Sequence, residues 1–287
     1  MAGNTYTDLS EANGWIPEPG SNEALLRDVE TSAVEAVARK VTMTSRTVSV
    51  PRFSAQGVDV VAEHALIPLK DATLDEVVLT AVKFADRFAI SVEDKEDAVV
   101  DALNAYKREW LSNYAITLDN AALGATAGPF ESVYNAVGAG NRSATAGNLS
   151  YEDLEAVIGD MEGNRKGGLV VIAHPKFKMS LRNLKDEAGL RVVTDPLGAG
   201  VPTVFGHEVR FSYGAATSAT YTDSPEGNPL LIVANKSGLI LGVRSGPESQ
   251  VSDAPQWETD HIELKMRARR GFALASADSA RVVELTV

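Results

Sequence analysis

The stretch from Thr42 to Gly124 decides the fold, and its centre reads VDVVAEHALIPLK (Val58 to Lys70) and then LDEVVLTAVKFADRFAI (Leu74 to Ile90). An outgoing and a returning strand predict a long two-stranded arm that feeds into a long helix. A two-stranded ribbon is marginal in water because nothing covers its faces, and unpaired strand edges invite pairing with another chain. We therefore expect the arm to pack against a neighbouring molecule, as in an assembly protein.

The returning strand is predicted to run without a break from Leu74 to Ile90. Period-two alternation places five apolar residues on one face: Val78, Val82, Phe84, Phe88 and Ile90. The opposite face carries Leu79, Ala81, Lys83 and Arg87. Because this second face is only partly polar, both faces are expected to be covered along part of the strand.

A long spine helix is predicted at about 92–123. Ser91 can cap its first turn, and the acidic run from Glu93 to Asp97 suits the positive end of the helix dipole. Apolar residues then recur at steps of three or four: Val99, Leu103, Tyr106, Trp110, Tyr114 and Leu118. Some 30 residues at about 1.5 Å each give a rod of roughly 45 Å. The helix is expected to end at Leu123, with Gly124 in the left-handed conformation.

The remaining pattern mixes helices and strands without strict alternation, which predicts an α+β fold. Helices are expected at 23–40, 149–163 and 175–184. Strands are expected at 168–173, within 201–212, and at 230–234, 239–243, 259–273 and 281–287. Loops are expected at 124–148 and 246–257. Residues 1–22 are typical of an extended arm, which is expected to dock through Trp15 and Ile16.

Composition excludes several classes of function. The chain has 287 residues, enough for one large domain or two modest ones, and no apolar run long enough to span a membrane. Cysteine is absent, which excludes disulfides, thiolate nucleophiles and cysteine-ligated metals. The net charge of −12 argues against a sequence-reading DNA-binding module. It would suit a container wall that must not adhere to a polyanion, but it is equally ordinary for a soluble bacterial protein.

No motif predicts catalysis, a cofactor or a metal. The four histidines, at 64, 174, 207 and 261, do not form a metal-binding spacing, and solvated or core-edge positions are expected for them. Gly138-Ala-Gly-Asn-Arg-Ser resembles part of a dinucleotide fingerprint, but no strand leads into it and Ser143 replaces the third glycine. An enzyme would need a convergent polar constellation that the sequence does not show.

One basic patch is predicted near the C-terminus. Alternation within the strand at 259–273 places Lys265, Arg267 and Arg269 on one face, and Arg270 adjoins them. In a chain with a net charge of −12, such a patch fits an acidic neighbour better than nucleic acid, although contact with nucleic acid stays open.

The order of these elements resembles that of the major capsid proteins of tailed bacteriophages, which have the Hong Kong ninety-seven fold. Encapsulin shells are relatives of the same fold. The resemblance covers nearly the whole chain and rests on residues 61–81, 88–94, 118–124, 171–190, 203–209 and 235–244. Each segment is a weak match alone, but their order and spacing together are fairly specific.

The resemblance implies a division into four parts. These are an N-terminal arm (1–22), an extended loop (44–84), a peripheral domain with the spine helix (23–43, 85–145 and 239–271) and an axial domain (146–238 and 272–287). It further implies self-assembly as hexamers and pentamers into an icosahedral shell around double-stranded DNA. Decoration, scaffolding and portal proteins are possible partners, the host bacterial cytoplasm is the expected place of assembly, and no membrane is involved. The alternative with the same fold is an encapsulin-like compartment that encloses cargo enzymes.

Some relatives cross-link neighbouring subunits through a lysine and an asparagine. Here no lysine occurs between Arg46 and Leu69, so no autocatalytic cross-link is expected. An N-terminal scaffolding region of the kind that some relatives remove by proteolysis is not expected either. The residues expected to make assembly contacts are Trp15, Arg52, Phe53, Gln56, Glu63, Lys70, Arg267 and Arg269.

Overall fold

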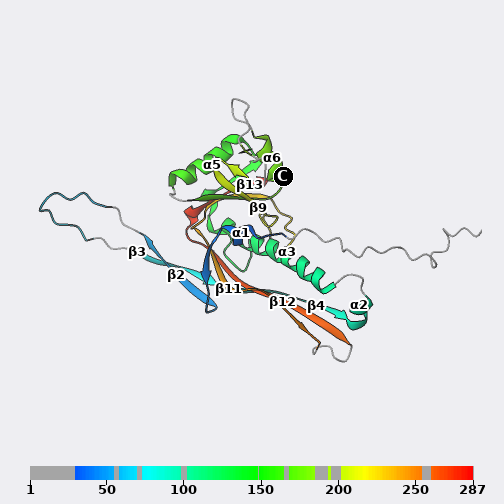
Figure 1. Cartoon of the computed structure of the whole chain (residues 1–287). Coiled ribbons are helices and arrows are strands. Elements are labelled where there is room, and N and C mark those ends of the chain that lie inside the picture. The colour runs from blue at the N-terminus through cyan, green and yellow to red at the C-terminus, as the bar shows by residue number, and fades with distance from the viewer. Residues whose placement is uncertain are drawn as a thin grey trace, which may run out of the picture.

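The computed structural model describes residues 30–54, 58–69, 73–97, 102–147, 149–164, 168–184, 193–194, 202–253 and 260–286. Two β-sheets of different size form the body, and a two-stranded hairpin projects from it (Figure 1). The mixture of helices with mostly antiparallel strands confirms the predicted α+β class. No helix in the described part of the chain is long and apolar enough to cross a membrane.

The first sheet is a long, four-stranded platform beneath helix α3 (Ala102–Leu123). Its strand order is β1 (Arg39–Thr42), β11 (Leu239–Ser252), β12 (His261–Leu274) and β4 (Val82–Ser91). Aromatic pairs join the sheet to the helix: Phe84 meets Tyr114 edge to face at 5.8 Å, and Phe88 stacks on Tyr106 at 4.4 Å. Alternation therefore divides β4 and β12 into a face that packs on α3 and a face that points away from it.

The second sheet has seven strands and is covered on both faces. Its order is β5 (Arg142–Ala146), β13 (Ala280–Thr286), β10 (Leu230–Asn235), β6 (Leu169–Ala173), β9 (His207–Phe211), β8 (Thr203–Val204) and β7 (Val193–Thr194). Alternate residues of β6 and β10 enter two separate cores, one shared with α3 and the other with α5 (Tyr151–Asn164) and α6 (Phe177–Asn183). Burial on both faces explains their continuous apolar sequences.

Two of the predicted helices differ from the structure. Within the helix expected at 23–40, residues 23–29 lie outside the described part, and the described part forms α1 (Ala33–Val37), capped by Ser32. Pairing of β1 with β11 places residues 39 and 40 in a strand and not in the helix. The spine helix appears as α2 (Val92–Asp97) and α3, and residues 98–101 lie outside the described part.

Gly124 ends the spine helix for a reason other than the predicted one. Its backbone is not left-handed. Instead, a side chain would collide with the neighbouring segment, because a Cβ at this position would lie 2.0 Å from the carbonyl oxygen of Ala216. The helix does stop at Leu123 as predicted, and close packing is what requires the glycine.

Three predictions about strands and loops were wrong. The returning strand breaks at Ala81 into β3 (Thr73–Thr80) and β4, so Leu79 is buried while Val78 is exposed. The loop expected at 124–148 contains α4 (Val133–Ala136) and β5, which pairs in parallel with β13. Strand β11 continues through most of the loop expected at 246–257, because register shifts after Val243 and Ser245 accommodate the extra residues.

Candidate assembly surfaces

The projecting hairpin exposes an unusual amount of apolar surface. Strands β2 (Thr47–Ser54) and β3 pair antiparallel from Thr47–Thr80 to Ser54–Thr73. Beyond them, the described residues 58–69 extend far from the body (Figure 1). Five large apolar side chains there are 78–102% exposed: Val58, Val60, Leu66, Ile67 and Leu69. Such a concentration of exposed apolar residues marks an interaction surface.

The base of the hairpin is fixed to the body. Met43, Leu79 and Ile240 are buried in a small separate core, against which partly buried residues of β2 and β3 pack. The Arg52 guanidinium donates to the carbonyl oxygen of Ala275, which follows β12, and also pairs with Asp75 on β3. The hairpin therefore leaves the body in a defined direction.

The predicted hairpin contacts fall into three groups. Arg52 holds the hairpin base, as described above. Phe53 lies in β2 opposite Leu74, and Glu63 lies exposed at the far turn, where the amide of Ala65 donates to the carbonyl of Ala62. Trp15, Gln56 and Lys70 lie outside the described residues.

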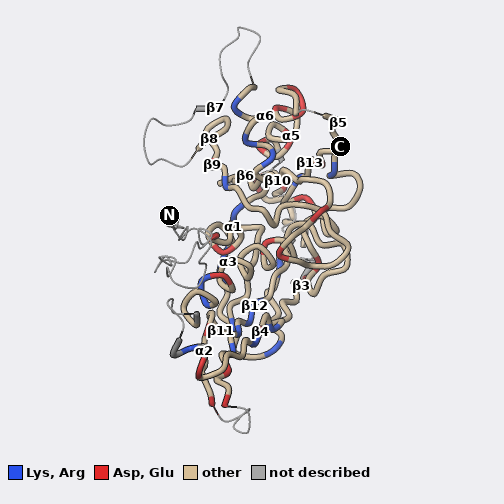
Figure 2. The backbone as a smooth tube through the Cα atoms, turned by 90° about the vertical axis from the view of Figure 1, so that its right-hand side faces the viewer, with Lys and Arg blue, Asp and Glu red and all other residues tan. Residues whose placement is uncertain are grey.

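A basic face lies on the side of β4 and β12 that points away from α3. It consists of Lys83, Arg87, Lys265, Arg267 and Arg269, and the lysine and arginine segments of both strands lie close together in Figure 2. The strand register places Lys265 directly opposite Arg87 and Arg269 directly opposite Lys83. The structure thus brings the predicted Arg267 and Arg269 together with Lys83 and Arg87 of β4, which the strand alternation alone did not connect to them.

Arg270 does not belong to the basic face. Its side chain points to the other side of the sheet, where it is 5% exposed and donates to Glu35 of α1 at 2.7 Å. The Tyr114 hydroxyl donates to the same Glu35 oxygen at 2.9 Å, and burial raises the pKa of Tyr114 well above its usual range. Adjacent residues of a strand point to opposite faces, which is why Arg270 separates from Arg269.

A buried carboxylate connects α3 to two other segments. Asp119 is fully buried and accepts hydrogen bonds from the hydroxyl of Ser32, from the amides of Ala33 (2.8 Å) and Val34 (3.2 Å), and from the hydroxyl of Ser212 (2.6 Å). Burial raises its pKa to about 6, against the opposing effect of these donors. Asp119 thus binds the amino end of α1, where a helix favours an anion, to the turn after β9.

The next residue, Asn120, extends this joint. Its amide nitrogen donates to the carbonyls of Gly214 (3.1 Å) and Ala216 (2.9 Å), and its oxygen accepts from the Ser218 hydroxyl at 2.7 Å. Gly214 touches the helix so closely that a Cβ would lie 2.6 Å from the carbonyl oxygen of Ile116. Neither Asp119 nor Asn120 was predicted as a joining residue from the sequence, although adjacent Asp and Asn are unfavourable inside a helix and are therefore a signal.

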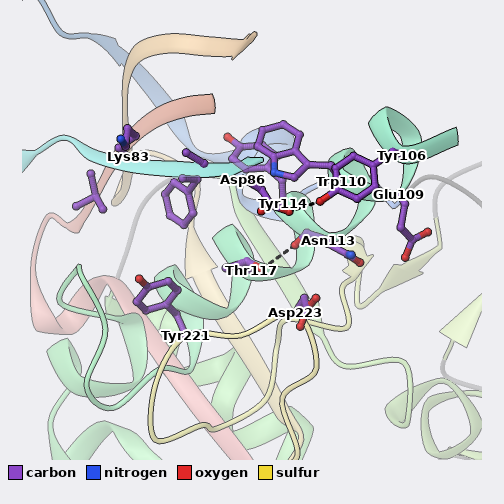
Figure 3. A pocket seen from close by; sticks show the side chains of 13 residues that line it. Lys83, Asp86, Tyr106, Glu109, Trp110, Asn113, Tyr114, Thr117, Tyr221 and Asp223 are labelled. Atoms are coloured by element: carbon purple, nitrogen blue, oxygen red, sulfur yellow. Dashed lines mark hydrogen bonds between the residues drawn. The ribbon is translucent and has the colours of Figure 1, made fainter. Parts of the chain in front are cut away.

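A shallow aromatic groove of about 280 Å³ lies between α3, β4 and the segment around Tyr221 (Figure 3). Trp110 and Tyr114 stack at 5.3 Å along it, and the Tyr106 hydroxyl donates to Asp86. Burial and this hydrogen bond raise the pKa of Tyr106 to about 12, so its hydroxyl stays protonated. The groove offers apolar contact and hydrogen bonds.

Neither a metal centre nor a catalytic histidine arrangement emerges from the described residues. No group of three His, Asp or Glu side chains is placed to hold a metal ion. His207 contacts Glu162 at 2.7 Å, and His174 is buried beside Tyr213, where burial lowers its pKa to about 4.

The family model described as Phage capsid family matches residues 13–285. The chain belongs to the phage capsid family. It is a structural subunit of a phage capsid, and its place is the shell of the virion. This membership does not favour the encapsulin-like compartment.

Solved structures with a similar fold span almost the entire capsid protein. A chain from Mycobacterium phage Bobi is 20% identical with a TM-score of 0.78, and the match covers 99% of this chain and 100% of that chain. A chain from Gordonia phage Cozz is 14% identical with a TM-score of 0.73, covering 100% and 97%. A structure described as "Capsid of native GTA particle computed with C5 symmetry" is 14% identical with a TM-score of 0.72, covering 98% and 99%. No curated protein sequence matches the chain.

Proposed function

We propose that this capsid protein assembles as hexamers and pentamers into an icosahedral shell that packages double-stranded DNA. The observation that carries the proposal is the hairpin, which holds five exposed apolar side chains far from the body on a fixed base. A monomer would leave this surface in water at a cost, whereas a neighbouring subunit could cover it. A hairpin that reaches away from its own subunit suits head-to-tail contacts, which close into rings.

The proposed domains follow the two sheets. The peripheral domain (23–43, 85–145 and 239–271) includes most of the four-stranded sheet and the spine helix. The axial domain (146–238 and 272–287) includes most of the seven-stranded sheet. The extended loop (44–84) is the hairpin, and the N-terminal arm comprises residues 1–22. The joint at Asp119 and Asn120 supports this division, because it links α3 to the turn after β9.

We propose a purely structural role, without catalysis or a cofactor. Contacts of the arm and the hairpin, or a separate decoration protein, would stabilise the shell in place of a lysine–asparagine bond. The absence of lysine between Arg46 and Leu69 supports this view. Scaffolding and portal proteins would take part in assembly in the host cytoplasm, and contact with DNA would be non-specific.

Electron microscopy of the protein purified from its native source, with and without nuclease treatment, tests the proposal. Closed shells tens of nanometres across that protect genome-length DNA are the expected result. Shells that contain protein cargo and no DNA would contradict it in favour of a compartment. A monomer or dimer that never assembles, even with partner proteins present, would overturn both.

A further inference from the structure

The basic face carries more positive charge than its surroundings neutralise. Arg87 pairs with Glu263 at 3.4 Å, and Arg267 pairs with Glu248 at 3.0 Å. The other three cations, Lys83, Lys265 and Arg269, form no ion pair within the described residues. Each of them also lies directly opposite another cation, an arrangement that destabilises a sheet unless an anion relieves it. In a chain with a net charge of −12, this face is a local exception that needs an acidic partner.

The residues of β4 that lie between these cations have small side chains. Ala85 and Ala89 occupy the intervening positions of β4, and both are exposed. On the same face of β11, Gln250 and Ser252 lie opposite Lys265 and Glu263. The side chains at these positions are small or polar, although Val251 borders the hollow beside Arg87 and Lys265. A ligand would therefore be held mainly by its charge. Alternate residues of a strand are about 6.8 Å apart, which suits an extended acidic segment lying along the cations.

We infer that the basic face binds the acidic N-terminal arm, residues 1–26, of a second copy of this chain. That segment contains Asp8, Glu11, Glu18 and Glu23 and has no lysine or arginine. The inference rests on the proposed shell, because it requires neighbouring subunits. Twenty-six extended residues span at most about 90 Å, which is ample to reach a neighbour.

A second copy is favoured because the first described residue of the chain and the basic face lie on opposite sides of the four-stranded sheet. The amide of Glu30, the first described residue, donates to the hydroxyl of Ser112 on α3 at 3.3 Å. Helix α3 covers one side of the four-stranded sheet, and the basic face lies on the other side. Binding to the basic face of an adjacent subunit does not require the chain to pass around the sheet of its own subunit.

The hairpin fits the basic face less well than the arm does. Residues 58–69 contain Asp59 and Glu63 and no lysine or arginine, so their charge has the right sign. Their five exposed apolar side chains, however, need an apolar partner, and a floor of alanines between cations cannot provide one. Residues 1–26 contain four acidic residues, against two in the hairpin segment.

Photo-cross-linking from Ala85 tests the inference in assembled particles. The photoreactive residue benzoylphenylalanine replaces Ala85, and trypsin then releases whatever peptide it has captured. Because the first basic residue of the chain is Arg27, the arm is a single peptide, Met1–Arg27, and the hairpin is another, Phe53–Lys70. Particles are assembled from a mixture of unlabelled chains that carry the probe and ¹⁵N-labelled chains that do not. The isotope content of the captured peptide then shows whether it comes from the same chain or from a neighbouring one. The probe at the exposed position Glu155 of α5 is the control.

The expected product is a ¹⁵N-labelled arm peptide attached to an unlabelled Ala85 probe, with none attached to the Glu155 probe. Capture of the hairpin peptide or of nucleic acid would overturn the inference, as would exclusively unlabelled arm peptide or no product at all. If particles still form normally, these results would contradict the inference without contradicting the proposed shell. A chain that forms no particles under any condition would remove the proposed shell and the inference together.

A charge exchange provides a second test. The double variant Lys83→Glu/Arg269→Glu is expected to reduce the yield of sedimenting particles at least tenfold, and adding Asp8→Lys/Glu11→Lys to it is expected to restore most of that yield. Lys95→Glu/Arg108→Glu changes the net charge equally on α2 and α3 and is expected to leave the yield unchanged. Equal losses in the two double variants, or no restoration by the arm changes, would contradict specific pairing.

Discussion

The hydroxyl of Ser212 donates a 2.6 Å hydrogen bond to Asp119, and this contact ties the turn after β9 to the C-terminal part of helix α3. The same carboxylate receives the amino end of α1, so three segments far apart in sequence meet at one buried anion. Its hydrogen-bond donors offset only part of the cost of burial, because its pKa stays raised to about 6. Loss of this group should therefore affect all three segments at once.

Replacement of Asp119 by Ala is expected to destabilise the subunit by about 2–4 kcal/mol, because several buried donors lose their acceptor. Urea unfolding of the unassembled subunit measures this change. Glu155→Ala, on the exposed side of α5, is the control and should change the free energy of unfolding by less than about 0.5 kcal/mol. A small change in the free energy of unfolding on Asp119→Ala would show that water can accept the hydrogen bonds that Asp119 normally accepts.

Asp119 should also make stability fall as pH rises. Its pKa in the folded state is raised from 3.8 to about 6, so the folded protein binds more protons than the unfolded chain between these values. The favourable contribution is complete below about pH 4 and is lost as the pH rises through about 6. Unfolding free energies of wild type and Asp119→Asn, measured from pH 4 to 7, should reveal it as a pH-dependent difference. A difference that is constant with pH would contradict the raised pKa.

His174 should have the opposite effect over a similar range. Burial lowers its pKa from 6.5 to about 4, so the folded state favours the neutral ring. Its contribution is complete above about pH 6.5 and is lost as the pH falls towards 4. His174→Gln should therefore lose less stability on acidification than wild type does, and parallel curves would rule this out.

Trp110 should be a major contributor to the stability of the spine helix. It is 9% exposed and stacks on Tyr114, so Trp110→Ala should cost about 3–5 kcal/mol. The neighbouring Leu111 is 36% exposed and provides a matched control, whose change to Ala should cost much less. An unchanged urea midpoint for Trp110→Ala would exclude its importance for packing.

The hairpin should matter for assembly and not for folding. Leu66→Ser/Ile67→Ser removes apolar surface that is 92% and 78% exposed in the subunit, so the free energy of unfolding should hardly change. Particle yield, measured by sedimentation, should fall sharply. Met179→Ser, at a 74% exposed position on α6, is the control and should leave the yield intact. Equal yields for both variants would argue against burial of the hairpin between subunits.

Local sequence patterns predicted the helices and strands whose buried residues form a continuous apolar run or recur at a regular spacing. Strands β6 and β10 and the end of α3 at Leu123 follow from such patterns, and so does the alternation that groups Arg267 with Arg269. Elements that depend on distant partners were missed. Strand β5 exists because β13 pairs with it, and β11 continues past Val243 because β12 provides a partner beyond the bulge.

The candidate surfaces were predictable to a similar degree. The hairpin follows from two strand-like runs, but its break at Ala81 depends on which strands pair with each half. The basic face needed the register that places Lys83 opposite Arg269. The Asp119 joint is a tertiary arrangement, and the sequence hints at it only through the adjacent Asp119 and Asn120 inside a helix.

Strand β12 has a mechanical consequence for a closed shell. One end lies at the base of the hairpin, where Arg52 holds Ala275, and the rest of the strand carries Arg267 and Arg269. It is hydrogen-bonded on both sides, to β11 and to β4. A force applied to the hairpin by one neighbour would therefore act along β12 and shear its hydrogen bonds to β11 and β4. The same force would reach the basic face, which is proposed to contact another neighbour. In the proposed shell, internal pressure would therefore place this strand under tension.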